Sequence, residues 1–266
     1  HNIICENGEV LAEAAPFTTG YAEAEADLGY IANERARLDR SENGQGYAYV
    51  NFELPLNGIV RRVYSPRPFV PANKARRNTV CERALTILAY GLKKRIEHTS
   101  ADKLVIGVSG GSDSTLALLV CKRALDLLKR PISDITAVTM PCFGTSERTL
   151  ANSVALAQAI GATIKKIDIS ATVTRHLKDI NHDITDTNVT YENAQARERT
   201  QVLMDLANDV NGLVIGTGDA SEAALGWATY NGDHMSMYAV NASVPKTLVL
   251  AIIAYQAELS QGELKR

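Results

Sequence analysis

The chain has 266 residues, of which 45% are hydrophobic and 22% charged, and its formal net charge is -2. This composition is that of an ordinary globular protein, and it argues against intrinsic disorder and against a protein that coats nucleic acid. No apolar run approaches the roughly 20 residues that cross a bilayer, and no charged-then-apolar leader begins the chain. We therefore expect a cytoplasmic protein of about two domains, with neither a membrane nor nucleic acid as its partner.

Residues 1–70 differ in composition from the rest of the chain. An Asn-Gly pair between two short apolar runs predicts a β-hairpin over residues 3–14. Aromatic and β-branched residues in the stretch 46–56 predict a further β-rich segment. Three prolines within residues 61–73 predict an extended linker, so we expect a domain boundary near residue 70.

From residue 76 onward, the sequence pattern alternates between helices and strands. Apolar residues at helical spacing predict a first helix that includes residues 80–96. The expected strands are then 103–108, 135–140, 163–169 and 212–217, and the expected helices are 114–128, 147–160 and 192–208. This alternation predicts an α/β fold, with a Rossmann-like parallel sheet and helices on both faces. Ligands of such sheets bind at the carboxyl ends of the strands.

The stretch LVIGVSGGSDSTLALLV, residues 104–120, runs an apolar strand into small residues and an aspartate before an amphipathic helix begins. A connector of serines and glycines leaves backbone N–H groups unshielded at the positive end of the helix dipole, which predicts an anion-binding loop. The stretch lacks the lysine of a Walker A loop and the third glycine of a dinucleotide fingerprint. The alternative is a glycine-rich turn with a helix-capping serine.

Two further clusters of polar residues lie after the anion-binding loop, one directly after a predicted strand and one at the start of a predicted helix. MPCFGTSERT, residues 140–149, comes directly after a strand, and by itself it is typical of a turn in which Ser146 caps a helix. YENAQARERT, residues 191–200, opens the long helix. Its Asn193, Gln195 and Arg197 could reach the edge of the sheet. Alternatively, Arg197 and Arg199 are simply solvated.

The fourth cluster, residues 214–247, combines a strand, a Gly-Thr-Gly turn, Glu222, the single tryptophan Trp227, an Asn-Gly-Asp turn and Lys246. We expect Asp113 and Glu222 at the ends of different strands, which is how a hard cation that bridges phosphate oxygens is held. The alternatives are that Glu222 is an ordinary acid in the first turn of a helix and that Trp227 belongs to the core.

The motifs S-G-G-S-D-S, G-T-G-D-x-S-E-x-x-L-G-W-x-T-Y and N-x-x-V-P-K-T occur in this order. Together they resemble the synthetase domain of the glutamine-dependent NAD⁺ synthetases, which are N-type ATP pyrophosphatases. The resemblance implies that residues 71–266 form a C-terminally incomplete domain of the PP-loop, adenine nucleotide α hydrolase-like type. It also implies that residues 1–70 are the end of a nitrilase-like αββα glutaminase domain plus a linker.

The resemblance further implies a ligase that amidates deamido-NAD⁺ (nicotinic acid adenine dinucleotide) to NAD⁺. The nicotinate carboxylate attacks the α-phosphorus of ATP and releases pyrophosphate, and ammonia derived from glutamine then displaces AMP. ATP and Mg²⁺ would be required, all substrates would be small molecules, and the working form would be a homo-oligomer. The Glu-Lys-Cys triad of the glutaminase would lie N-terminal to these residues, so we assign no catalytic residue and do not take Cys5 as the nucleophile.

The family's binding residues can be transferred to matching positions of this chain. The ATP site would comprise Gly107, Val108, Ser109, Gly110, Gly111, Ser112, Asp113, Ser114, Thr217 and Lys246. The deamido-NAD⁺ site would comprise Asn193, Glu222, Trp227 and Asp233, and the Mg²⁺ ligands would be Asp113 and Glu222. Ammonia-dependent relatives carry T-K-Y-G-D where residues 229–233 read T-Y-N-G-D, so no lysine contact is transferred there.

Two alternatives remain. GMP synthetase, asparagine synthetase and tRNA lysidine synthetase use the same loop, but G-T-G-D-x-S-E and V-P-K-T favour NAD⁺ synthetase, and the chain shows no basic appendage for RNA. A non-catalytic module that binds adenine nucleotides is the other alternative. Asp113, Glu222 and Lys246 argue against it, because nucleotide binding alone needs no pair of Mg²⁺ ligands.

Overall fold

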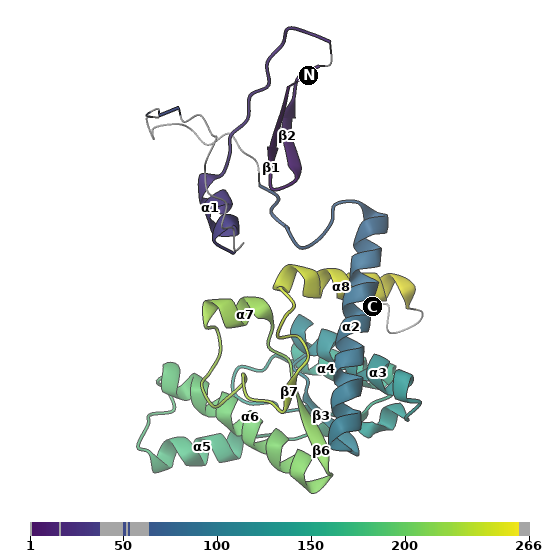
Figure 1. Ribbon diagram of the computed structural model, residues 1–266. Coiled ribbons are helices and arrows are strands. Elements are labelled where there is room, and N and C mark those ends of the chain that lie inside the picture. Colours follow the sequence, from purple (N-terminus) through teal and green to yellow (C-terminus); the bar gives the residue numbers. More distant parts are fainter. Residues whose placement is uncertain (1, 16, 38–49, 52, 54–63, 261–266) are drawn as a thin grey trace. The chain divides into compact units, whose positions relative to one another are not determined.

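The computed structural model describes residues 2–15, 17–37, 50–51, 53 and 64–260. Contacts divide the chain into two compact units, His1–Pro66 and Arg67–Arg266, and Figure 1 labels most of their helices and strands. This division lies close to the predicted boundary at residue 70. No helix in the described parts is long and apolar enough to cross a membrane.

The first unit contains the predicted hairpin. Strands β1 (Ile3–Glu6) and β2 (Glu9–Glu13) pair in antiparallel fashion. Asn7 and Gly8 connect them with φ angles of 47° and 85°, both in the left-handed region that an Asn-Gly hairpin turn requires. The hairpin prediction is therefore confirmed.

Two other features of this unit differ from the expectation. Helix α1 (Leu28–Arg37) was not predicted, and Glu6 is buried beside its start, where it accepts a hydrogen bond from the backbone N–H of Asp27 at 2.7 Å. Of the β-rich stretch predicted over residues 46–56, only residues 50, 51 and 53 are described, and they form no strand. The rest of that prediction lies outside the described residues.

The second unit is built on a five-stranded parallel sheet in the order β5-β4-β3-β6-β7. Its strands are β3 (Lys103–Gly107), β4 (Ile135–Thr139), β5 (Thr163–Lys166), β6 (Gly212–Gly216) and β7 (Tyr238–Ala239). The chain proceeds outward from β3 through β4 to β5 and then returns to the other side of β3. The strand order therefore reverses between β3 and β6, which is the position where open α/β sheets bind ligands.

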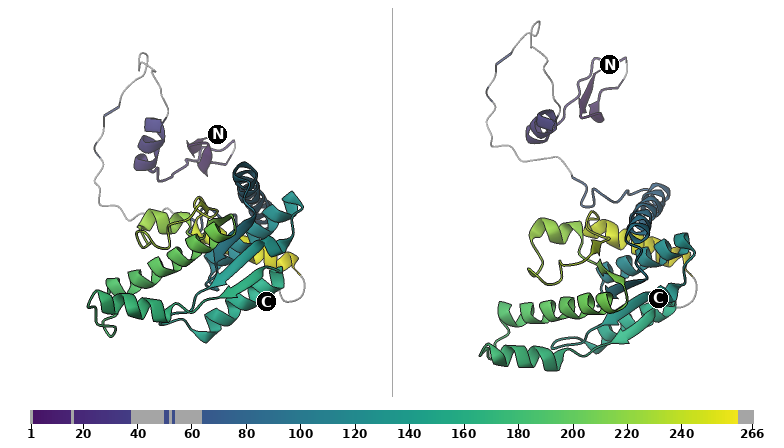
Figure 2. Two further views of the ribbon diagram at one scale, coloured as in Figure 1. Left: turned by 90° about the horizontal axis from the view of Figure 1, so that it is seen from below. Right: turned by 60° about the horizontal axis from the view of Figure 1, so that its bottom comes forward.

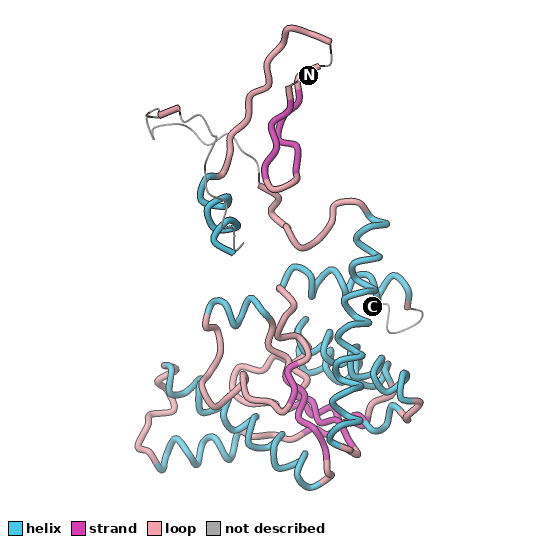
Figure 3. Tube along the Cα trace, in the orientation of Figure 1, coloured by secondary structure: helices cyan, strands magenta, loops and turns pink. Residues whose placement is uncertain are grey.

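Helices cover both faces of this sheet, as Figures 2 and 3 show. Helices α2 (Lys74–Thr99), α3 (Ser112–Leu128), α4 (Glu147–Ile160) and α8 (Lys246–Leu259) form one core with inward residues of the strands, including Leu104 and Ile106. Helices α5 (Ser170–Asp179) and α6 (Val189–Asp209) form a second core with residues such as Val105. Because neighbouring strand residues point to opposite faces, both sides of β3 are buried, and the predicted Rossmann-like α/β fold is confirmed.

Candidate active site

The loop between β3 and α3 has the conformation that the glycines of its sequence require. Gly110 has a φ of +82°, and a Cβ atom there would lie 2.5 Å from the backbone oxygen of Thr149 in α4. Gly111 is the N-cap of α3 and provides no side-chain cap, so the alternative of a helix-capping serine is wrong. The first N–H groups of α3 are consequently available to an anion.

Serine hydroxyls brace this loop internally. The Ser109 Oγ atom accepts a hydrogen bond from the Gly111 backbone N–H at 3.3 Å and lies 3.3 Å from the Ser114 Oγ atom. Ser114 also donates to the Gly111 carbonyl oxygen at 3.1 Å. The loop is therefore held in shape by its own side chains.

Lys246 joins this loop to the loop that follows β6. Its Nζ atom lies 2.7 Å from both carboxylate oxygens of Asp113, 2.9 Å from Asp219 Oδ2 and 3.5 Å from Glu222 Oε1. We call these four residues the Lys246 cluster. Its carboxylates outnumber its ammonium group, so the cluster retains an excess of negative charge that a second cation could neutralise.

The pKa values of Lys246 and Asp219 are shifted in favour of the charged forms, because polar and ionic contacts in the cluster outweigh the effect of burial. Partial burial alone would lower the pKa of Lys246, but its hydrogen bonds to Asp113 and its close contact with the Asp219 carboxylate raise that pKa above its ordinary value. Burial alone would raise the pKa of Asp219, but the backbone N–H of Glu222 and the Lys246 ammonium lower it. Both groups are therefore held in their charged forms.

Glu222 has a structural role and also faces the cluster. Asp219 is the N-cap of α7 (Ala220–Leu225), and the two residues form a capping box. Asp219 Oδ1 accepts a hydrogen bond from the Glu222 N–H at 2.8 Å, and Glu222 Oε2 accepts one from the Asp219 N–H at 3.1 Å. The helix-acid interpretation of Glu222 is thus correct, and its other oxygen, Oε1, remains directed at Lys246.

The donor chemistry of the cluster fits Mg²⁺ only in part. Carboxylate oxygens such as those of Asp113 and Glu222 are the hard ligands that Mg²⁺ takes. Among the residues that the structure describes, however, no group of three or more His, Cys, Asp and Glu side chains could hold a metal ion. The arrangement therefore fits an ion that also takes oxygens from a phosphate group and from water, as Mg²⁺ commonly does.

Two buried residues of this region were missed in the sequence analysis. The side chain of Asp219 is fully buried beside Lys246, and Asn241 is fully buried and donates hydrogen bonds to the carbonyl oxygens of Asp113 and Thr217. Both residues stand in motifs quoted above, the D of G-T-G-D and the N of N-x-x-V-P-K-T. Their presence in these motifs was the available signal.

The residues predicted for deamido-NAD⁺ lie on and beside the loop that follows α7. Thr229 donates its hydroxyl to Asn193 Oδ1 at 2.8 Å and its backbone N–H to Asp233 Oδ1 at 2.6 Å. Arg197 of α6 donates to the Tyr230 carbonyl oxygen at 3.1 Å, so it is not merely a solvated charge. Asn193 and Asp233 are therefore brought together through Thr229.

Trp227 begins the same loop and is 77% exposed, so the alternative of a core tryptophan is wrong. Its backbone N–H donates to the Glu222 carbonyl oxygen at 2.9 Å, which links this loop directly to α7. Glu222, predicted to contact the dinucleotide, makes its side-chain contacts within the Lys246 cluster. An exposed indole ring is a surface on which a flat ligand can stack.

The second and third sequence clusters face each other. Ser146 caps α4 by accepting a hydrogen bond from the Thr149 N–H at 3.2 Å, as that interpretation predicted. Phe143 stacks on Tyr191 with the ring centres 5.6 Å apart. Residues of these two clusters, together with Thr187, line an open pocket of about 440 Å³; the lining residues are Phe143, Gly144, Thr145, Thr187, Tyr191, Glu192, Gln195 and Arg199.

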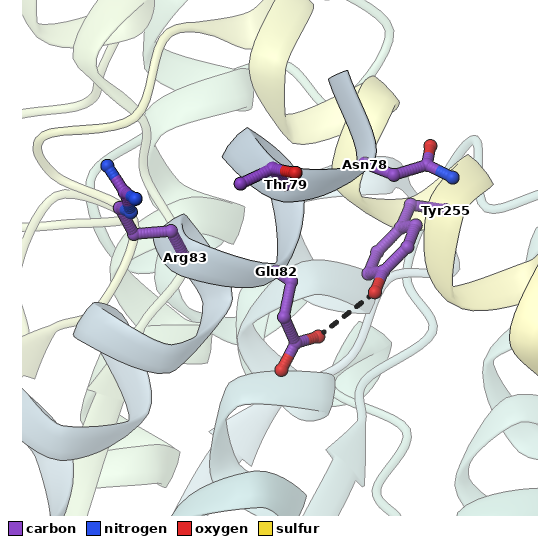
Figure 4. A pocket seen from close by; sticks show the side chains of 5 residues that line it. All are labelled: Asn78, Thr79, Glu82, Arg83 and Tyr255. Atoms are coloured by element: carbon purple, nitrogen blue, oxygen red, sulfur yellow. Dashed lines mark hydrogen bonds between the residues drawn. The ribbon is translucent and has the colours of Figure 1, made fainter. Parts of the chain in front are cut away.

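A second open pocket, of about 430 Å³, is lined by residues of α2 and α8 and contains none of the predicted site residues (Figure 4). It is lined by Asn78, Thr79, Glu82, Arg83 and Tyr255. Its carboxylate already has partners, because Glu82 accepts a hydrogen bond from the Tyr255 hydroxyl at 3.3 Å and forms an ion pair with Arg123. We therefore assign this pocket no part in the candidate site.

Solved structures share this fold. A glutamine-dependent NAD⁺ synthetase from Acinetobacter baumannii, in complex with adenosine diphosphate, aligns with a TM-score of 0.63 and 27% identity over 76% of this chain and 36% of that one. An NH₃-dependent NAD synthetase from Campylobacter jejuni, in complex with the nitrate ion, aligns with a TM-score of 0.60 and 26% identity over 70% of this chain and 76% of that one.

Sequence comparison gives the same family. A glutamine-dependent NAD(+) synthetase of Mycobacterium leprae is 42% identical over 98% of this chain, which spans about two fifths (41%) of that relative's length. A glutamine-dependent NAD(+) synthetase of Thermotoga maritima is 33% identical over 64% of this chain and 29% of its own length. Residues 85–257, which carry the sheet and the Lys246 cluster, match the NAD synthase family model, and the chain therefore belongs to the NAD synthase family.

Proposed function

We propose that this chain supplies the synthetase site of an enzyme that amidates deamido-NAD⁺ to NAD⁺ at the expense of ATP. The observation that carries the proposal is the Lys246 cluster, which joins an anion-binding loop after β3 to an acidic turn after β6. This is the point where the strand order of the sheet reverses. Membership of the NAD synthase family supports the same assignment.

Residues 107–114 would bind the pyrophosphate portion of ATP. The unshielded N–H groups at the start of α3 attract phosphate oxygens, and Lys246 adds a positive charge beside them. Thr217, which follows β6, would contact the same nucleotide. Asp113 and Glu222 would hold Mg²⁺, which when bound neutralises phosphate charge.

Asn193, Trp227 and Asp233 would bind deamido-NAD⁺. Trp227 offers an exposed ring for stacking. Asn193 and Asp233 both accept hydrogen bonds from Thr229 and so hold the loop to which Trp227 belongs. The nicotinate carboxylate would attack the α-phosphorus as the bond to pyrophosphate breaks. Ammonia would then form the amide as AMP leaves. The residues of the chain contribute by orienting the reactants and by stabilising the developing charge.

The source of ammonia and the setting of the enzyme are part of the same proposal. By analogy with the mycobacterial and Thermotoga relatives, which are glutamine-dependent NAD(+) synthetases, glutamine would supply the nitrogen. Residues 1–70 would be the end of the glutaminase domain that releases it. We further propose that the protein works in the cytoplasm as a homo-oligomer.

Exchange of labelled pyrophosphate into ATP tests the first chemical step in the natural full-length protein. We expect exchange that requires both Mg²⁺ and deamido-NAD⁺, because adenylation of the dinucleotide is reversible until ammonia arrives. Binding of ADP without any exchange would instead support a non-catalytic module that binds adenine nucleotides. Exchange driven by xanthosine monophosphate rather than deamido-NAD⁺ would indicate a GMP synthetase.

A further inference from the structure

Asn241 bridges the two loops that carry the proposed ATP site. It is fully buried in the segment between β7 and α8. Its Nδ2 atom donates one hydrogen bond to the Asp113 carbonyl oxygen at 2.9 Å and another to the Thr217 carbonyl oxygen at 3.0 Å. The acceptors belong to the start of α3 and to the turn after β6, so a single amide joins the ends of two strands.

The chemistry of these bonds requires a primary amide. Both hydrogens of the Asn241 amide are needed, one for each carbonyl oxygen, and both acceptors are oxygens, so the amide cannot be reversed. Its Oδ1 atom is buried and has no hydrogen-bond partner among the described residues. An unpaired buried acceptor is unfavourable, but the reversed amide would lose both hydrogen bonds and place Oδ1 against two carbonyl oxygens, so the observed orientation is the better one.

The segment from Asn241 to Lys246 is also fixed to α7 by its backbone. The Ala220 N–H donates to the Val244 carbonyl oxygen at 3.0 Å, and the Lys246 N–H donates to Ser221 Oγ at 3.0 Å. The Val244 N–H donates to the Asn241 carbonyl oxygen at 2.8 Å. Asn241 is therefore the point at which the segment that ends in Lys246 is joined to the start of α3.

We infer that Asn241 is a positioning residue that sets the distance between the anion-binding loop and the acidic turn after β6. This inference rests on the proposed function, because it assigns the effect to ATP. Asn241 bonds to backbone carbonyls and not to the carboxylates of the cluster. Its loss should thus misplace the groups that bind phosphate without removing any of them.

The test is Asn241→Leu in the natural full-length protein, since leucine has a similar size, carries no charge and donates no hydrogen bond. We expect the Kd for ADP with Mg²⁺ to rise about tenfold and the KM for ATP to rise with it. The KM for deamido-NAD⁺ should stay within twofold, because the side-chain hydrogen bonds of Asn241 go to Asp113 and Thr217 and not to the residues proposed to bind the dinucleotide. A general loss of folded structure would raise the KM for both substrates and not the KM for ATP alone.

Asn211→Asp is the matched control. Asn211 also joins two segments through Nδ2, to the Ser100 carbonyl oxygen at 3.4 Å and to Asp102 Oδ2 at 2.9 Å, but it precedes β6 at the opposite end of the strands. We expect this variant to lower the melting temperature while leaving the Kd for ADP unchanged. If Asn241→Leu does not fold, Asn241→Ser should raise the Kd for ADP at least threefold.

Two results with these variants would overturn the inference. One is that the folded Asn241 variants bind ADP with an affinity within twofold of that of the natural protein. The other is that the KM rises equally for ATP and for deamido-NAD⁺. Binding of ADP does not require turnover, so a natural protein that binds ADP but forms no NAD⁺ would contradict the proposed function alone. A natural protein that binds no ADP would overturn both.

Discussion

Gly110 shows how closely the anion-binding loop is fitted to its surroundings. At a φ of +82°, alanine is strained, and its Cβ would also lie 2.5 Å from the Thr149 carbonyl oxygen. We expect Gly110→Ala to displace the loop and to weaken ADP binding at least tenfold, as titration calorimetry can measure. Gly161→Ala is the control, because Gly161 has a φ of +88° but faces open space, and it should lose only about 1 kcal/mol of stability.

Lys246 is the cation on which three carboxylates converge. Lys246→Met would leave Asp113 and the buried Asp219 without a counter-charge, and it would remove the positive charge proposed to face ATP. We expect NAD⁺ formation to fall by about a hundredfold, measured as initial rates at saturating substrates. Lys122→Met removes a lysine that pairs with Asp126 on the surface of α3, and it should leave the rate unchanged. Equal rates for the Lys246 variant and the natural protein would contradict this role.

Some residues of the candidate site could be predicted from the sequence and others could not, for physical reasons. Asp113, Glu222 and Lys246 could be singled out because they stand in the motifs S-G-G-S-D-S, G-T-G-D-x-S-E and V-P-K-T, which resemble those of the NAD⁺ synthetases. Asp219 and Asn241 were not singled out, because their roles depend on burial and on hydrogen bonds to other segments, and local spacing does not record these. The exposure of Trp227 could not be predicted either, because an indole ring suits a core as well as a binding surface.

At the level of elements, an ion-pair network fastens β3 to the turn before β4. Asp134 is buried and accepts hydrogen bonds from Lys103 Nζ at 2.7 Å and from Arg130 Nε at 3.0 Å. Burial alone would raise the pKa of Asp134, but these two cations lower it below its ordinary value. Arg130 also donates to the Ala101 carbonyl oxygen at 2.8 Å, so the network fixes the amino ends of both strands.

This network predicts a particular dependence of stability on pH. Because the folded pKa of Asp134 is depressed, its contribution should be complete above the unfolded value near pH 4 and should disappear as the pH falls through the folded value. Asp134→Asn should lower the free energy of unfolding by about 1–3 kcal/mol at pH 7. The difference in free energy of unfolding between Asp134→Asn and the natural protein, measured by urea titration, should shrink below pH 4.

Asp179→Asn is the control for that experiment. Asp179 pairs with Arg175 on the exposed surface of α5, so its loss should change the free energy of unfolding by less than about 0.5 kcal/mol. A pH-independent difference for Asp134→Asn would mean that the network contributes by packing and not by charge.

The elements themselves were predictable where their hydrophobic pattern was long. Strands β3 to β6 and helices α2, α3, α4 and α6 carry apolar runs or helical periodicity, and they were anticipated, whereas α8 was not. Strand β7 has two residues and α7 has six, too few to establish a period. The ten-residue helices α1 and α5 were also missed, because their sequences are rich in charged and polar residues.

At the level of the whole second unit, the candidate site is assembled from segments that are far apart in sequence. The start of α3, the turn after β6, the loop after α7 and the start of α8 meet only when the sheet has formed. Site and fold are thus thermodynamically linked. ADP with Mg²⁺ should therefore raise the melting temperature of this unit, and the increase should depend on ADP concentration.

The most direct test of the proposed function is product analysis with the natural full-length protein. It would be supplied with deamido-NAD⁺, ATP and Mg²⁺, and with either glutamine or ammonium as the nitrogen source. We predict that NAD⁺, AMP and pyrophosphate form in equal amounts with both nitrogen sources, and that Lys246→Met forms almost none. Formation of ADP and phosphate, or the absence of NAD⁺ with either nitrogen source, would contradict the assignment of this chain as an NAD⁺ synthetase site.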